Sequence, residues 1–208
     1  LNEKTINQYT GNYQLPDHTR FSVRFNAQNQ LLIPVDNAKL YQQFFGSPDY
    51  NRVTAQKYNK LSTEIMDLLV QGKYRAAAKL EKVYMPSHKE SKLFREEKRL
   101  FERLKNDGGA LKSIELLGSV ARQNGAAYLT YFKLIYEKNT LYFFFYWKGE
   151  VLEQRDPARN LIQLFDHLQG GKFMAKHNQL KIELNTQNGV PALKVGDKLV
   201  LKKITGSK

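Results

Sequence analysis

Residues 127–154 read AYLTYFKLIYEKNTLYFFFYWKGEVLEQ, two aromatic segments that meet at a Glu-Lys-Asn-Thr turn. Aromatic side chains favour the pleated, half-buried surface of a β-strand. Successive strand residues point to opposite faces, which gives one face Leu141, Phe143, Phe145 and Trp147, and the other face Tyr142, Phe144 and Tyr146. Because both faces are apolar, this stretch predicts a long, curved antiparallel sheet with helices on its concave side.

Three helices are predicted before this sheet. After Val53 the apolar residues recur every three or four positions, first to Gly72 and then over residues 74–84. Ser87 and Glu90 have the spacing of a capping box and predict the start of a third helix, which runs to the glycine pair at 108–109. Three helices followed by a meander of three long strands predict an α+β domain over residues 52–156.

The two ends of the chain have strand patterns. Residues 1–51 predict short strands, with a hairpin over residues 21–35 and another strand at 39–45. Residues 171–208 alternate again and turn at Asn188-Gly189. Between the sheet and this segment, Asp156-Pro157 suits a helix start, and residues 157–170 predict a connecting helix with four apolar residues facing inward, Leu161, Leu164, Phe165 and Leu168.

The composition is strongly basic, with a formal net charge of +13 over 208 residues and no cysteine. The absence of cysteine excludes disulfides, thiolate metal sites and cysteine nucleophiles. Lysines and arginines are spread along the chain, often beside Glu, without the motifs of nucleic-acid-binding domains. We therefore favour a solvated basic surface and do not expect nucleic acid as a partner; binding of an anionic polymer is the alternative. No apolar run has the length of a membrane span.

A resemblance covers both ends. Tyr9, Gly11 and Tyr13 in INQYTGNYQL form Y-x-G-x-Y, which resembles the opening of the small β domain found after the catalytic domain of many β-lactamase-related serine hydrolases. The closing segment QLKIELNTQNGVPALKVGDKLVLKKI is similar to the end of that domain. The resemblance implies an exported, periplasmic or cell-surface bacterial protein with a catalytic serine-hydrolase domain in the same polypeptide. We infer one small β domain, residues 1–51 and 171–208, split by an insertion.

The inserted residues 52–156 resemble the nuclear-transport-factor-two-like cone, also called the cystatin-like fold. The similarity lies in the helices around MDLLVQGKYRAAAKL, then GGALKSIELLGSV, and the aromatic strands that end at Tyr146-Trp147. Concave sheets closed by helices leave apolar pockets, and related cone-fold enzymes perform acid–base chemistry inside them. The pocket candidates in this sequence are Tyr84, Glu115, Tyr131, Phe143, Phe145 and Trp147.

No catalytic constellation is evident. A β-lactamase-type hydrolase needs S-x-x-K, and no serine here has lysine three residues later; G-x-S-x-G is also absent. Among acid–base candidates, Glu115, Tyr128 and the pocket tyrosines form no convincing pair, and His88 is predicted in the first turn of a helix. The histidines lack metal-ligand spacing, so neither a metal nor another cofactor is predicted; they are His18, His88, His167 and His177.

These observations predict a non-catalytic accessory module, which packs on a catalytic domain or binds a ligand in the cone. The outer sheet face with Tyr142, Phe144 and Tyr146 is a candidate surface for homodimerisation. Two alternatives stay open: a small-molecule enzyme of the cone fold, isomerase-like or dehydratase-like, and a binder of anionic polymer or nucleic acid.

Overall fold

The computed structural model describes residues 1–46 and 51–204. It is an α+β structure with two antiparallel sheets, so the predicted α+β class is confirmed. The chain divides into two compact units, which we call the β unit (Leu1–Pro48 with Leu161–Lys208) and the helical unit (Asp49–Asn160).

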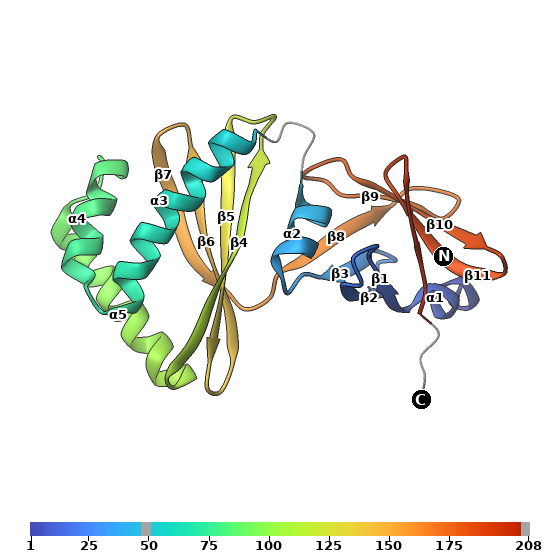
Figure 1. The fold of residues 1–208 in the computed structure, drawn as a ribbon, viewed down its shortest axis with the longest axis horizontal. Coiled ribbons are helices and arrows are strands. Elements are labelled where there is room, and N and C mark those ends of the chain that lie inside the picture. The colour runs from blue at the N-terminus through green and yellow to red at the C-terminus, as the bar shows by residue number, and fades with distance from the viewer. Residues whose placement is uncertain (47–50, 205–208) are drawn as a thin grey trace. The chain divides into compact units, whose positions relative to one another are not determined.

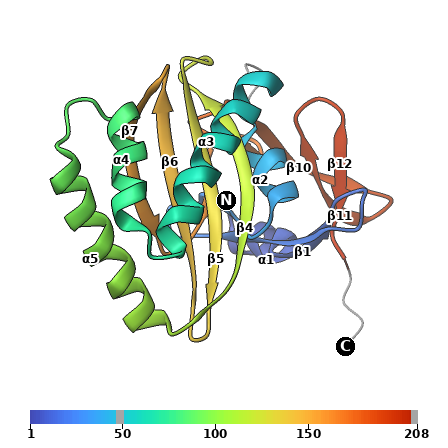
Figure 2. The same cartoon turned by 60° about the vertical axis from the view of Figure 1, so that its left-hand side comes forward.

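The helical unit contains three helices followed by a four-stranded antiparallel meander in the order β4-β5-β6-β7. Its helices and strands are α3 (Arg52–Val70), α4 (Tyr74–Tyr84), α5 (Glu90–Gly108), β4 (Leu111–Arg122), β5 (Ala127–Tyr136), β6 (Thr140–Lys148) and β7 (Val151–Ala158). All three helices cover the same face of the sheet (Figures 1 and 2). The sequence predicts the three helices and the first three strands, but not the separate strand β7.

Helix α5 starts later than the capping-box spacing predicts. Its N-cap residue is Lys89, and no side chain caps it. The Ser87 hydroxyl instead lies 3.2 Å from Nδ1 of the neighbouring His88, and both residues are in the turn that precedes the helix. The placement of His88 in a first helical turn is therefore wrong. The helix ends as predicted, at Gly109, where φ is +80° and the backbone N–H donates to the Lys105 carbonyl.

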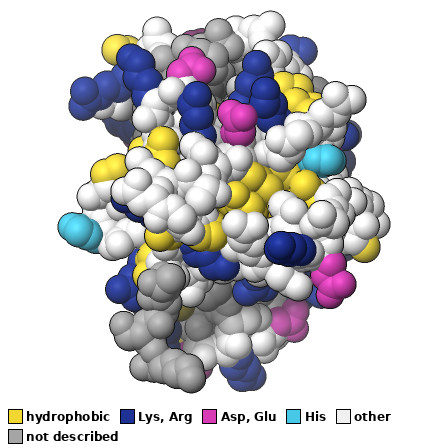
Figure 3. Space-filling model, turned by 90° about the vertical axis from the view of Figure 1, so that its right-hand side faces the viewer, with side chains coloured by type: hydrophobic (Ala, Val, Ile, Leu, Met, Phe, Trp, Pro, Cys, Tyr) yellow, Lys and Arg dark blue, Asp and Glu magenta, His cyan; other side chains and the backbone are white. Residues whose placement is uncertain are grey.

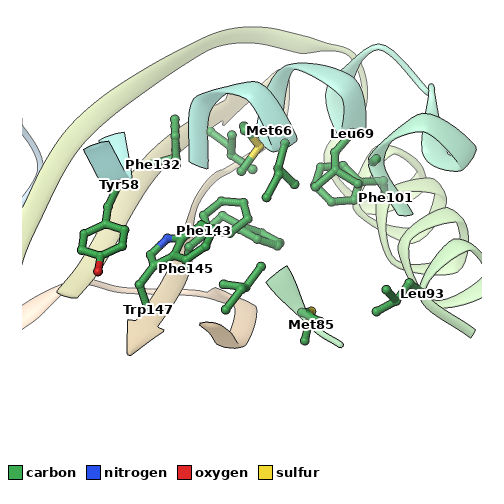
Figure 4. Close-up of a cluster of buried hydrophobic side chains, with 14 of the residues drawn as sticks. Tyr58, Met66, Leu69, Met85, Leu93, Phe101, Phe132, Phe143, Phe145 and Trp147 are labelled. Carbon is green, nitrogen blue, oxygen red and sulfur yellow. The ribbon is translucent and has the colours of Figure 1, made fainter. Parts of the chain in front are cut away.

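The core of the helical unit lies between the helices and the sheet (Figure 4). The predicted alternation of β6 is confirmed: Phe143, Phe145 and Trp147 are fully buried against the helices. In β5 the residues paired with them are Phe132, Thr130 and Tyr128, which therefore share this face. Helix α3 contributes Met66 and Leu69, and α5 contributes Leu93 and Phe101.

The β unit is one eight-stranded antiparallel sheet, in the order β1-β2-β3-β8-β9-β10-β11-β12. Its elements are α1 (Glu3–Tyr9), β1 (Gly11–Gln14), β2 (Arg20–Phe25), β3 (Leu31–Pro34), α2 (Ala38–Phe45), β8 (Ile162–His167), β9 (Lys172–Met174), β10 (Lys181–Gln187), β11 (Val190–Val195) and β12 (Leu199–Lys202). A bridge between Tyr13 and Lys203 joins the two outermost strands, so the sheet nearly closes into a barrel. Both ends of the chain thus share one sheet, as an insertion requires.

Two predictions for this unit are wrong. Residues 39–45 form helix α2 rather than a strand, because the Asn37 side chain accepts the Leu40 N–H as an N-cap and Leu40, Tyr41 and Phe44 fall on one buried helical face. Residues 157–170 form no connecting helix. Pro157 lies in β7, opposite Phe143. Residues Ile162–His167 form strand β8, which pairs with β3 so that Phe165 is opposite Leu31.

Alternation explains strand β8. Gln163 and Phe165 are buried whereas Ile162 and Leu164 are exposed, which is the two-residue period of a strand and not that of a helix. A short helix that the sequence analysis does not predict, α1, begins at an N-cap, since the Asn2 side chain accepts the Thr5 N–H.

Candidate functional site

The structure places four of the six predicted pocket residues together on the helix side of the sheet. Phe143, Phe145 and Trp147 have no exposed surface, and the Tyr84 ring meets the Trp147 ring edge-on at 5.4 Å. The indole N–H of Trp147 donates to the Ser62 hydroxyl at 2.9 Å. These aromatic side chains fill the space between helices and sheet with ordinary core packing (Figure 4).

The other two predicted pocket residues face the opposite side. Tyr131 is opposite Phe144 in the β5–β6 pairing, and Phe144 is on the face away from the helices. Glu115 is opposite Lys133 and lies between Ile114 and Leu116, both of which pack against the helix-side core. Glu115 and Tyr131 therefore lie on the other face of the sheet from Trp147, contrary to the prediction of one shared pocket.

A buried polar cluster that the sequence analysis does not identify lies where α4 and α5 meet strand β7. It consists of Glu81 on α4, Glu97 on α5 and Arg155 on β7, which we call the carboxylate–arginine triad. Glu81 follows buried Ala77 by four residues, and Glu97 follows buried Leu93 by four. Residues four apart share a helix face, so both helices direct a carboxylate into the protein.

Arg155 joins the two carboxylates. Its Nε donates to Glu81 Oε1 at 2.5 Å, and its Nη2 lies 3.2 Å from Glu81 Oε2. The same Nη2 forms an ion pair with Glu97 Oε1. The Arg155 side chain is 10% exposed, that of Glu97 1%, and that of Glu81 has no exposed surface. The guanidinium thus contacts Glu81 through Nε and Nη2, and Glu97 through Nη2.

The contacts of Glu97 are incomplete. Its Oε2 is buried and has no hydrogen-bond partner among the described residues. Buried polar atoms in proteins normally have a partner, and a carboxylate oxygen without one loses its solvation with no compensation. Burial without a hydrogen-bond partner therefore disfavours the ionised form of the Glu97 carboxyl group.

Burial controls the protonation of this triad. The pKa of Glu97 is raised to about 8, chiefly by desolvation and also by the nearby Glu81 carboxyl group, while Arg155 opposes the shift. Burial also raises the pKa of Glu81, against the opposing effect of Arg155. Burial of two carboxyl groups around a single guanidinium therefore favours the uptake of a proton by the triad.

Glu97 and Arg155 line a cleft of about 380 Å³ at the surface of the helical unit. Helix α5 and strand β7 supply most of the lining, and the turn between α4 and α5 contributes Met85 and His88. The lining residues are Met85, His88, Glu96, Glu97, Arg99, Leu100, Arg103, Glu153, Gln154, Arg155 and Asp156. Groups of both charge signs therefore surround a cavity whose volume falls in the range of about 300–1,000 Å³ that is typical of ligand sites.

The sequence contains a signal for this site. The apolar stripe of α5 places Leu93, Glu97 and Phe101 at four-residue intervals, so a charged residue occupies a position that the helical period assigns to the core. Charged residues are rarely buried without a partner. The partner, Arg155, belongs to a strand far along the chain, and only the tertiary structure identifies it.

The structure describes no metal centre: among residues 1–46 and 51–204, no three His, Asp or Glu side chains gather closely enough to hold an ion. His88 lines the cleft, whereas the other three histidines do not. No helix in the described part of the chain is both long and apolar enough to cross a membrane.

The basic residues are dispersed on the face drawn in Figure 3. Lys and Arg side chains (dark blue) are scattered over this face, with Asp and Glu (magenta) and hydrophobic side chains (yellow) between them. On this face the described basic side chains therefore form no single continuous patch.

Comparison with known proteins gave no relative. Neither the protein families, nor the curated proteins, nor the solved structures that were searched contain a match to this chain.

Proposed function

We propose that the chain is a non-catalytic accessory module and that its helical unit binds a small polar ligand in the cleft beside the carboxylate–arginine triad. The observation that carries this proposal is the Glu97 carboxylate, which is buried, lines the cleft and has an Oε2 without a partner among the described residues. A ligand that displaces the side chains covering this buried oxygen and donates a hydrogen bond to it would recover the solvation it has lost.

The filled aromatic core supports a binding role over catalysis in the cone. Phe143, Phe145 and Trp147 are packed rather than arranged around a cavity, and Trp147 already has its hydrogen-bond acceptor in Ser62. The polar groups of the cleft lie instead between α5 and β7, toward solvent.

The family assignment belongs to the same proposal. We infer an accessory region of an exported β-lactamase-related serine hydrolase, with a catalytic domain in the same polypeptide. The Y-x-G-x-Y residues Tyr9, Gly11 and Tyr13 and the single sheet built from both chain ends support this inference. Three helices packed on one face of an antiparallel meander support a nuclear-transport-factor-two-like insertion.

A second function, acid–base catalysis on a small molecule, is favoured by one observation. Burial raises the pKa of Glu97 to about 8, and a general acid or base works best when its pKa is near the operating pH. In this alternative Glu97 transfers its proton to or from a substrate in the cleft, and the substrate leaves chemically changed.

A thermal-shift screen separates the two functions. The melting temperature of the helical unit is followed by fluorescence of Trp147, the single tryptophan, with amino acids, short peptides, sugars and carboxylates as probes. A compound at 100 times its Kd stabilises the folded state by about 2.7 kcal/mol. We expect one class to raise the melting temperature of the natural chain but not of Glu97→Gln, and to be recovered unchanged.

The control is Glu64→Gln, an exposed carboxylate on α3 in the same unit, which should respond like the natural chain. Conversion of a hit by the natural chain but not by Glu97→Gln would favour the enzyme. Identical responses of all three proteins to every compound would overturn the cleft as a binding site.

A further inference from the structure

Three exposed arginines follow one another on α5 at four-residue intervals, Arg95, Arg99 and Arg103. Residues four apart lie on the same helix face, and all three of these arginines line one shallow hollow of about 530 Å³ on α5. We call them the arginine stripe. Within the described part of the chain, no side chain of the stripe is in an ion pair or a hydrogen bond. Three guanidinium groups in a row are therefore open to a partner from outside.

The lysines of the same helix have partners that these arginines lack. Lys92 is 3.7 Å from Glu96, and Lys98 is 3.8 Å from Glu102, in each case with the glutamate four residues later. The stripe instead places one arginine four residues after another, and like charges at this spacing destabilise a helix. Asp107 lines the same hollow and opposes one of the three charges. The stripe thus has a net positive charge that the glutamates of α5, already beside lysines, do not compensate.

We propose that the arginine stripe binds an acidic peptide segment in extended conformation, whose carboxylates occur at every second residue. A guanidinium group binds a carboxylate with two parallel hydrogen bonds, and three of them offer this contact in a row. Binding on the exposed side of α5 needs no access to the buried Glu97 oxygen, so this surface is an addition to the ligand site proposed above.

The repeat of the stripe matches the repeat of an extended peptide. An α-helix rises about 1.5 Å per residue, so Arg95 and Arg103 are separated by about 12 Å along the axis of α5. In an extended strand, alternate side chains share a face and recur every ~6.7 Å, so three alternating carboxylates span ~13 Å. The two spans differ by only about 1 Å, which exposed, flexible arginine side chains can cover. Consecutive carboxylates would point to opposite faces and could not all reach the stripe.

Two other anionic partners fit this surface less well. Single-stranded nucleic acid binds where bases can stack on aromatic rings, but Phe94, the aromatic residue of the hollow, has the guanidinium of Arg75 at 5.6 Å from its ring centre. A helix that lies on a membrane needs an exposed apolar face. The apolar residues of α5 pack in the core, and none of the exposed large hydrophobic residues in the described part of the chain belongs to α5.

Fluorescence anisotropy with two labelled peptides tests the stripe. In the first peptide three glutamates alternate with serines, and the second is its isomer with the three glutamates in succession. At low ionic strength the alternating peptide should bind about threefold or more tightly than the isomer, because all of its carboxylates meet a guanidinium at once. Its affinity should fall as salt is added, since salt screens exposed charges.

Variants that remove charge locate the binding surface. Arg95→Gln should weaken the alternating peptide about threefold, and the combination of Arg95→Gln, Arg99→Gln and Arg103→Gln should abolish its binding. All three arginines are exposed, so these variants are expected to fold. Lys60→Gln removes the same charge from an exposed position on α3 and is the matched control; it should bind the peptide like the natural chain.

Three results would overturn the proposal. The first is that the alternating peptide does not bind, or binds no better than its isomer. The second is that the triple variant binds it as well as the natural chain does. The third is that polyphosphate, dextran sulfate or vesicles with anionic lipid bind through the stripe while the alternating peptide does not, which would assign the surface to another anionic partner.

Discussion

Replacement of Arg155 by methionine tests the triad most severely. Methionine keeps the unbranched stem of the arginine side chain but removes the guanidinium that binds Glu81 at 2.5 and 3.2 Å and also pairs with Glu97. Two carboxyl groups then stay buried without a cation. Removal of one partner from a buried ion pair typically costs about 3–5 kcal/mol, and the single guanidinium here serves two partners. We expect a loss of free energy of unfolding near the upper end of this range.

Urea denaturation followed by Trp147 fluorescence measures this loss. Trp147 is fully buried in the helical unit and is the only tryptophan of the chain, so its signal reports the unfolding of that unit. With a denaturant slope of about 2 kcal/mol per molar urea, the midpoint should fall by roughly 2 M.

A compensated variant serves as the control. Simultaneous change of Glu81→Leu, Glu97→Leu and Arg155→Met removes all three charges, and apolar replacements of buried ion pairs are often neutral or stabilising by about 1–4 kcal/mol. This variant should unfold at or above the midpoint of the natural chain. A midpoint for Arg155→Met that is unchanged, or a triple variant that is as unstable as the single one, would refute the buried triad.

Three further predictions follow from individual contacts and from protonation. The pKa of Glu97 is raised from 4.5 to about 8 in the folded state. Protonation of Glu97 therefore stabilises the folded state fully below pH 4.5, and this stabilisation is lost as the pH rises through 8. The urea midpoint of the natural chain should fall between pH 6 and 9, and the midpoint of Glu97→Gln should fall less. Ser62→Ala leaves the buried Trp147 N–H without its acceptor and should cost about 1–3 kcal/mol by the same fluorescence assay, whereas Thr63→Ala on the partly exposed side of α3 should cost less. Asn37→Ala removes the N-cap of α2 and should destabilise the β unit by about 1 kcal/mol, measured by amide hydrogen exchange of β2 and β3; equal exchange rates in both proteins would contradict the cap.

Sequence patterns predicted those parts of the fold in which local period and burial agree. The aromatic alternation of β6 correctly separated Phe143, Phe145 and Trp147 from the residues between them, because a strand of a covered sheet has only two faces. Two of the wrong predictions, at 39–45 and 157–170, concern short segments with ambiguous spacing. Apolar residues at positions 161, 164, 165 and 168 match a helix, but pairing with β3 provides the hydrogen bonds that make residues 162–167 a strand.

The candidate site was harder to predict, for a physical reason. Glu81 and Glu97 interrupt apolar helix faces, which marks both positions as unusual, yet their burial depends on a guanidinium from β7. The prediction grouped Tyr131 with Trp147, although the two belong to opposite faces. The pairing of β5 with β6 decides which face Tyr131 occupies, since Tyr131 is opposite Phe144. The register of this pairing is fixed by turns and bulges, which a residue pattern does not specify.

Chemical-shift mapping by NMR tests the central claim, that the cleft beside Glu97 binds a ligand. A compound that raises the melting temperature of the natural chain in the thermal-shift screen is titrated into the isotope-labelled chain, and the amide signals that move are assigned to residues. We predict that the largest shifts cluster at residues 96–103 of α5 and 153–156 of β7, which line the cleft, and that they disappear in Glu97→Gln but persist in Glu64→Gln. Shifts that are absent, or that occur outside these two segments, would contradict the account.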